Sequence, residues 1–169
     1  MKTIVTLFLA MLALPLQAAD STNRLHFPVS GFSIAPLEVP PGTITRQALM
    51  MYLPPNGNFA ANVNVQVQPY SGTIEDYMAL TQKQFKDVGV KVIEQKKIGK
   101  SVVACEYNGE LQGQSVHWYA RAEKSGGHVY LATASAAEQH WAAQGAQLKA
   151  CVDSLRCDGG PPDAAPPQR

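Results

Sequence analysis

The stretch Asn62-Val63-Asn64-Val65-Gln66-Val67-Gln68 alternates polar and apolar residues without interruption. Successive side chains of an extended chain point to opposite faces, so this alternation predicts a half-buried strand with its valines on one face. A strand is also expected just before it, over residues 46–53, because the turn-forming run from Pro54 to Asn58 ends it. Phe32-Ser33-Ile34 is a shorter strand candidate. The fold is therefore expected to be built on a sheet.

Two helices are predicted, one after this strand and one near the C-terminus. Thr73 is placed as the N-cap of the first helix, Asp76 completes an acidic variant of the capping box, and Gly89 ends the helix. The residues expected to face the core recur at spacings of three and four: Ile74, Tyr77, Met78, Thr81, Phe85 and Val88. The second helix is expected to begin with a capping box of Ser135 and Glu138 and to run to about Leu155.

Four strands are expected between the helices, over residues 90–98, 101–107, 110–122 and 128–134. Asn108-Gly109 is predicted to form the turn between the second and third of them, because both central positions of such a turn need positive φ. Ser125-Gly126-Gly127 is predicted to turn the chain into the fourth. Strands joined by hairpins, without regular alternation of strand and helix, are typical of an α+β domain on a mainly antiparallel sheet.

The two ends of the chain differ in composition from its middle. Residues 1–19 have one early lysine, an uncharged apolar run and the small residues Ala18-Ala19, which predicts a signal peptide cleaved after Ala18 or Ala19. Residues 157–169 are rich in Pro and Gly and are expected to be a disordered tail. One α+β domain is expected over residues 20–156. The apolar run is too short for a stable membrane anchor, and export to the periplasm, or secretion, is expected.

Three cysteines, Cys105, Cys151 and Cys157, would reach an oxidising compartment, where a disulfide is expected. Helical spacing places Cys151 on the buried stripe of the second helix, and Cys105 lies within a central strand. We therefore favour a Cys105–Cys151 bond that fixes this helix to the sheet. The alternative is the local Cys151–Cys157 pair, and either choice leaves one cysteine over.

Several segments together resemble the PsbP-like superfamily, which includes the photosystem accessory protein PsbP and the bacterial envelope protein DcrB. The segments are Asn62 to Val65, the helix start at Thr73 to Tyr77, Gly99, Gly113, the strand Val129 to Thr133, and the helix with Trp141 that ends at Cys151 to Leu155. The resemblance covers about residues 32–155. It implies an α/β/α sandwich around an antiparallel sheet, a bacterial source, and a protein that acts by binding other proteins.

Known catalytic and metal-binding spacings are not found in the sequence. None of the four histidines, His26, His117, His128 and His140, has a spacing typical of a metal site, and the predicted hairpin register keeps His117 and His128 far apart. No nucleophile elbow, redox cysteine pair or phosphate loop is present. We therefore expect no catalytic residue, no metal and no cofactor.

Loops offer the candidate partner surface. Apolar residues stand where loops usually carry polar ones: Leu37 and Val39 in one Pro-rich loop, and Pro54, Pro55 and Phe59 in another. The formal net charge of +1 gives no reason to expect nucleic acid as a partner.

Together these features predict an exported, non-enzymatic protein-binding or accessory factor of the bacterial cell envelope, with an envelope protein as its partner. Two alternatives stay open. One is a small periplasmic hydrolase with a site assembled from separated residues, and the other is an inhibitor or immunity-type binding protein.

Overall fold

The computed structural model describes residues 24–36 and 45–157. The predicted signal peptide, the tail after Cys157, and the candidate surface residues Leu37 and Val39 lie outside the described residues. The chain divides into two units, Met1–Pro40 and Pro41–Arg169. Within the described ranges, no helix is both long and apolar enough to cross a membrane.

The first unit contains a small antiparallel hairpin. Strand β1 (Leu25–Phe27) is joined to β2 (Phe32–Ile34) by the short 3-10 helix η1 (Pro28–Ser30). Phe27 and Phe32, which face each other across the hairpin, stack with ring centroids 4.8 Å apart. The predicted strand at Phe32–Ile34 is confirmed, whereas its partner β1 was not predicted.

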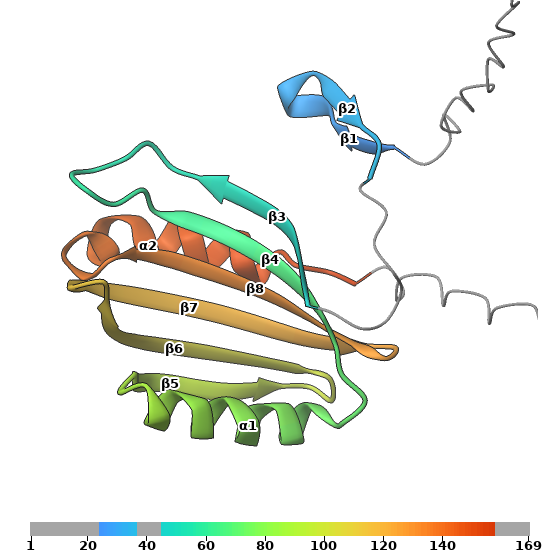
Figure 1. Cartoon of the computed structure of the whole chain (residues 1–169), viewed down its shortest axis with the longest axis vertical. Helices are drawn as coiled ribbons and strands as arrows, with labels where there is room; N and C mark the ends of the chain where they lie inside the picture. The colour runs from blue at the N-terminus through green and yellow to red at the C-terminus, as the bar shows by residue number, and fades with distance from the viewer. Residues whose placement is uncertain (1–23, 37–44, 158–169) are drawn as a thin grey trace, which may run out of the picture. The chain divides into compact units, whose positions relative to one another are not determined.

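The second unit is built on a six-stranded sheet with the order β3-β4-β8-β7-β6-β5, in which every neighbouring pair is antiparallel (Figure 1). Its strands are β3 (Arg46–Tyr52), β4 (Asn62–Pro69), β5 (Lys91–Ile98), β6 (Val102–Leu111), β7 (Gln114–Ser125) and β8 (His128–Ala137). The helices are α1 (Ile74–Asp87) and α2 (Glu138–Asp153). The α+β fold predicted from the sequence is confirmed.

The two helices lie on opposite faces of the sheet and cover it unequally. Helix α2 packs along β7 and β8, where Leu148 and Val152 join the valines and alanines of the main core cluster. Helix α1 lies beside β5 and β6 at one edge of the sheet (Figure 1). It buries Ile74 fully, and Tyr77 and Met78 pack only partly against a smaller cluster. One face is therefore well covered and the other is left partly open.

The predicted N-terminal capping box is confirmed for α1 but not for α2. The Thr73–Asp76 capping box of α1 is present, because the Thr73 side chain accepts from the Asp76 N–H and the Asp76 carboxylate accepts from the Thr73 N–H. The capping box predicted for α2 is wrong. Strand β8 continues to Ala137, so Ser135 is a buried strand residue, and Ala137 is an N-cap without a side-chain hydrogen bond.

The predicted turn at Asn108-Gly109 is also wrong. Both residues lie within β6, where Asn108 pairs with His117 and Gly109 with Val116. The chain turns instead at Gln112 and Gly113, whose φ angles are 52° and 78°. A two-residue hairpin turn needs two residues with positive φ, and this pair supplies them.

The favoured Cys105–Cys151 disulfide is not formed. Cys105 lies on the α1 face of the sheet with Val103, and Cys151 packs into the cluster under α2 on the opposite face. The sheet stands between the two thiols, and side-chain alternation along β6 sends Cys105 away from α2. Cys105 and Cys151 are both free thiols, so the alternative Cys151–Cys157 bond is not present in the structure either.

Candidate functional site

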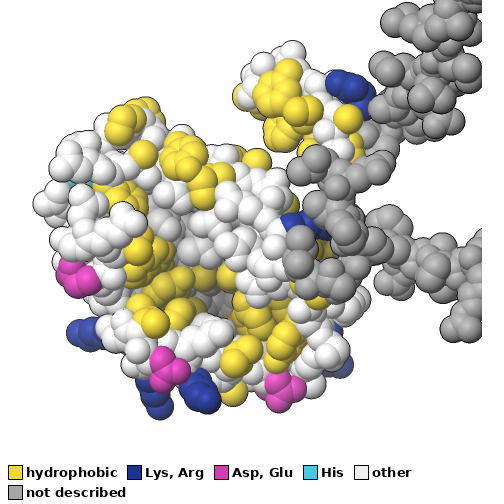
Figure 2. All heavy atoms as spheres, in the orientation of Figure 1, with side chains coloured by type: hydrophobic (Ala, Val, Ile, Leu, Met, Phe, Trp, Pro, Cys, Tyr) yellow, Lys and Arg dark blue, Asp and Glu magenta, His cyan; other side chains and the backbone are white. Residues whose placement is uncertain are grey.

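A cleft of about 370 Å³ lies between α1 and the sheet face that α2 does not cover. Figure 2 shows apolar side chains gathered around a hollow on this side of the molecule. Its floor is made of small or apolar strand residues, among them Ala120, Ala122 and Leu131. Because α1 stands at the edge of the sheet and the floor residues are small, the space is left unfilled. Its volume is within the range of small-ligand sites, about 300–1,000 Å³.

Three aromatic residues, Tyr77, Phe85 and Tyr107, line this cleft, and further rings pack against two of them. Phe85 of α1 packs on Tyr107 of β6 with ring centroids 4.5 Å apart, and Tyr107 stacks on Trp118 of β7 at 5.4 Å. On the other side, Tyr77 meets Tyr70 edge to face at 5.3 Å. Aromatic walls offer large apolar contact area with few rotatable bonds, which suits them to binding.

A few polar groups are placed along the same cleft. The Tyr77 hydroxyl donates to Gln68 at 2.9 Å, and Gln95 accepts from Gln82 at 2.5 Å. The hydroxyl of Tyr107 has no hydrogen-bond partner within the described part of the chain. It is therefore available to a molecule that enters the cleft.

None of the lining residues is charged at neutral pH. The lining consists of Thr45, Gln68, Tyr77, Met78, Leu80, Thr81, Gln84, Phe85, Gln95, Val103, Cys105, Tyr107, Ala120, Ala122 and Leu131. Burial raises the pKa of the Cys105 thiol to about 11 and that of Tyr77 to about 12, and it raises the pKa of Tyr107 further. All three groups thus stay protonated, and the cleft favours an uncharged, largely apolar guest.

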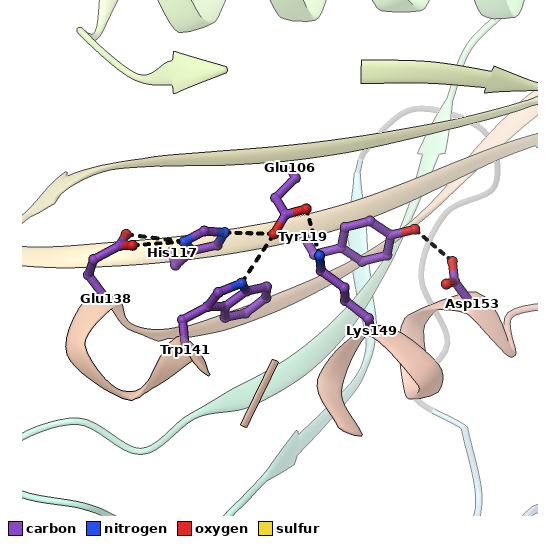
Figure 3. A network of polar contacts seen from close by, with 7 residues as sticks. All are labelled: Glu106, His117, Tyr119, Glu138, Trp141, Lys149 and Asp153. Carbon is purple, nitrogen blue, oxygen red and sulfur yellow. Dashed lines mark hydrogen bonds and ion pairs between the residues drawn. The ribbon is translucent and has the colours of Figure 1, made fainter. Parts of the chain in front are cut away.

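A second feature, on the other face of the sheet, is a polar cluster beneath α2 (Figure 3). The Glu106 carboxylate of β6 receives hydrogen bonds from His117 Nε2 at 3.0 Å, Trp141 Nε1 at 3.1 Å and Lys149 Nζ at 2.6 Å. The other ring nitrogen of His117 lies 3.1 Å from both carboxylate oxygens of Glu138. The cluster therefore connects β6, β7 and both ends of α2.

Glu106 is ionised in this cluster. Burial alone would raise the pKa of its carboxyl, but the hydrogen bonds from Lys149, His117 and Trp141 outweigh burial and hold the pKa below its usual range. His117 is 5 % exposed and meets a carboxylate at each ring nitrogen, so both nitrogens are best satisfied as donors. Together with Lys149, which also lies against Glu106, the ring ties the two glutamates into one network.

Comparison with known proteins bears on the fold. The chain matches no family model and no curated protein sequence. Among solved structures it is similar to PA94 of Pseudomonas aeruginosa, a protein of unknown function for which a regulatory role has been suggested, with a TM-score of 0.63 and 16% identity over 82% of this chain and 99% of that one. A weaker match is PsbP (CyanoP) of the cyanobacterium Synechocystis sp. PCC 6803, with a TM-score of 0.42 and 15% identity over 83% and 96%.

The chain shares its fold with PA94. The α/β/α order implied by the resemblance seen in the sequence is present, with α2 on one face of the antiparallel sheet and α1 on the other. At this level of identity, the likeness concerns the fold alone.

The predicted surface loop lies at the end of the sheet where α2 begins. Pro54 and Pro55 are exposed and Phe59 is half-buried. Phe59 borders a shallow depression shared with Gln139 and Ser115. This loop does not line the cleft beside α1, so the structure contains two separate candidate surfaces.

His117 and His128 remain apart, as the sequence predicted. His117 pairs with Ala136 and His128 with Ser125, at opposite ends of the β7–β8 hairpin. No group of three or more metal-ligating side chains comes together in residues 24–36 and 45–157.

Neither the cleft nor the polar cluster is predicted by the sequence. The cluster joins side chains 11 to 43 positions apart. The only signal was the alternation that places His117 and Tyr119 on one face of β7. The cleft follows from where α1 docks, which no local pattern specifies.

Proposed function

We propose that this protein is an exported, non-enzymatic accessory protein of the bacterial cell envelope, and that it holds an uncharged apolar group of a partner protein in the cleft beside α1. The cleft is the observation that carries the proposal. It is large enough for a small guest and lined by aromatic rings, and it has no charged side chain. Export is inferred from the signal-peptide pattern at the N-terminus.

Binding fits this site better than catalysis does. Protonated Tyr107 and Cys105 can orient a guest through hydrogen bonding or apolar contact, but at neutral pH neither is an activated nucleophile. Glu106 and His117 lie on the opposite face of the sheet, where their hydrogen-bonding atoms are already occupied. Trp141 and Lys149 donate to the ionised Glu106. The ring nitrogens of His117 lie against the carboxylates of Glu106 and Glu138.

The first experiment tests whether the cleft takes an uncharged apolar guest. The fluorescence of a neutral solvatochromic dye such as Nile red would be titrated with residues 20–169. We expect saturable binding that Ala122→Phe weakens at least tenfold, because a phenyl ring from the floor fills the space. Ala146→Phe, on the exposed side of α2, is the matched control and should bind as the wild type does. Equal binding by all three proteins contradicts the proposal.

The second experiment tests whether the guest belongs to a protein. A photo-reactive phenylalanine analogue would replace Leu80, a cleft residue that is 45% exposed, or the exposed Ala146 as control. In the producing cell, irradiation of the Leu80 variant should crosslink one partner through an apolar segment that mass spectrometry identifies. The added Ala122→Phe substitution should abolish that crosslink. Crosslinking that persists with the cleft filled, or that is equal at Ala146, contradicts a partner site in the cleft.

A further inference from the structure

Strand β3 has the side-chain pattern of an inner strand although it stands at the edge of the sheet. Among the described strands, it pairs only with β4. Met50 and Tyr52 lie on the cleft face and are 37% and 63% exposed, while Met51 lies on the α2 face and is 41% exposed. An exposed edge strand with apolar side chains is a place where another strand can add. Edge strands usually carry charges that prevent pairing.

The opposite edge of the sheet follows the usual protective pattern. Strand β5 carries Lys91, Lys96 and Lys97 between its apolar residues. Its pairing with β6 is interrupted by an irregularity between Val92 and Glu94. Lysines and bulges on an edge strand discourage a further strand from adding. The two edges therefore differ, and only β3 is suited to continue the sheet.

We propose that the segment Leu49–Leu53, which we call the β3 edge, pairs with the same segment of a second copy of this chain. The irregularity of β3 between Gln47 and Leu49 limits the regular pairing at one end, and Pro54, which has no N–H, limits it at the other. An antiparallel pair of identical strands is related by a two-fold axis perpendicular to the sheet. Residues that face each other across this axis must lie on the same face.

An axis through Met51 satisfies these conditions. Met51 then faces Met51 of the second copy, Met50 faces Tyr52, and Leu49 faces Leu53. Every pair is apolar, and Arg46, the single charged residue of β3, lies outside the paired segment. The charge pattern thus favours a second copy, because no like charges meet and no buried charge lacks a partner.

The hollow beside Met51 supports the same occupant. An apolar space of about 190 Å³ lies between Met51 and Leu53 of the β3 edge and Leu148 and Cys151 of α2. Its lining is mainly apolar, with the amides of Asn62 and Gln147 as exceptions. The Met51 side chain of a second copy would lie at the two-fold axis, next to this hollow. Methionine suits such a place because its flexible side chain fills irregular apolar gaps.

The pairing also sets the geometry of the assembly. A two-fold axis perpendicular to the sheet leaves both α2 helices on one side and both clefts on the other. The dimer would present two clefts to the same side. A pair of five-residue segments is small for a stable interface, so we expect a reversible dimer with a dissociation constant on the order of micromolar or weaker.

Sedimentation velocity of residues 20–169 over a concentration series tests the proposal. We expect a monomer–dimer equilibrium in the wild type that Met51→Lys weakens by about tenfold or more, because two lysines would then face each other across the axis. Ile93→Lys, at a site of β5 that is 49% exposed, is the matched control and should leave the equilibrium unchanged. Circular dichroism confirms that each variant is folded, and Tyr52→Lys replaces Met51→Lys if it is not.

Three outcomes would overturn the proposal. In the first, the wild type stays monomeric at a concentration of about 0.5 mM. In the second, the dimer forms in both β3 variants as it does in the wild type. In the third, Ile93→Lys weakens the dimer as much as the β3 substitutions do. Mild oxidation of Met51→Cys in a Cys151→Ser/Cys157→Ser background should add an intermolecular disulfide, since facing Cβ atoms of an antiparallel pair are about 5 Å apart. No such bond should form with Ile93→Cys in the same background.

Discussion

The imidazole of His117 and the indole of Trp141 stack with ring centroids 4.1 Å apart and planes within 14° of parallel. Both rings also donate a hydrogen bond to the same oxygen, Oε1 of Glu106. Lys149 Nζ takes the other oxygen and lies 5.3 Å from the centroid of the Tyr119 ring. One carboxylate of β6 thus fixes two residues of α2, although the helix itself lies over β7 and β8.

The substitution Glu106→Gln should lower the free energy of unfolding at pH 7 by about 3 kcal/mol, because it leaves the Lys149 ammonium and the His117 ring without their shared anionic partner. Urea unfolding of both proteins measures the difference. The exposed Glu110→Gln on the same strand is the control and should change the free energy of unfolding by less than about 0.5 kcal/mol.

The effect of Glu106→Gln should depend on pH. The pKa of Glu106 in the folded protein lies below the ordinary value of 4.5, so the folded state binds the proton less tightly than the unfolded state does. Stability from this group is therefore present above about pH 4.5 and is lost as the pH falls through the folded pKa. The difference between wild type and Glu106→Gln should shrink between pH 5 and pH 3. A difference that is constant over this range would show that Glu106 is not the titrating group.

The N-cap of α1 should contribute measurably to stability. Thr73→Ala removes the side-chain half of the capping box, in which Thr73 Oγ1 accepts from the Asp76 N–H at 3.1 Å, and should cost about 1 kcal/mol. Thr73→Ser keeps a hydroxyl at the same place and should restore most of the loss. Thermal unfolding followed by circular dichroism compares the three proteins. A serine variant as unstable as the alanine variant would show that the methyl group matters and the cap does not.

The thiol of Cys105 should react more slowly than the thiol of Cys151. It is 8% exposed and burial raises its pKa to about 11, whereas Cys151 is half-buried. With iodoacetamide at pH 8, Cys151 should be modified first, and the rate at Cys105 should rise about tenfold per pH unit until the pH nears the pKa. Peptide mass mapping over time follows both sites. Equal rates at pH 8 would mean that the cleft is far more open than the structure shows.

The same mapping on protein purified without reductant tests how the cysteines are paired. The structure separates Cys105 from Cys151 by the sheet, so a Cys105–Cys151 crosslink should not be found.

The strands were predictable because their signals are local. The alternation from Asn62 to Gln68 depends on one strand with one buried face, and the structure has β4 there with Val63 and Val65 under α2. The α1 capping box was equally local. The α2 start was mistaken because Ser135 and Glu138 have capping-box spacing, yet pairing of β8 with β7 continues to Ala137 and takes Ser135 into the sheet.

The sites were not predictable for a related reason. Glu106 meets Lys149 only after β6, β7 and α2 have packed, and nothing near Glu106 in the sequence marks it as a partner. The cleft depends on an absence of packing between α1 and small floor residues such as Ala120 and Ala122. Alanine is an ordinary core residue of strands, so no sequence pattern shows that the space between it and α1 is left unfilled.

The β6–β7 hairpin offers a direct test of the mistaken turn. Asn108-Gly109 is the stronger turn dipeptide, but the structure turns at Gln112-Gly113, where Gly113 has a φ of 78° that side chains with a Cβ adopt at a cost. Gly113→Ala should therefore lower the free energy of unfolding by about 1 kcal/mol. Gly109→Ala should cost less, because its added Cβ would meet the nearest atom, Cγ2 of Val90, at an ordinary 3.4 Å. If Gly109→Ala proves the more damaging in urea unfolding, the turn lies at Asn108-Gly109, and Gly109 does not pair with Val116 of β7.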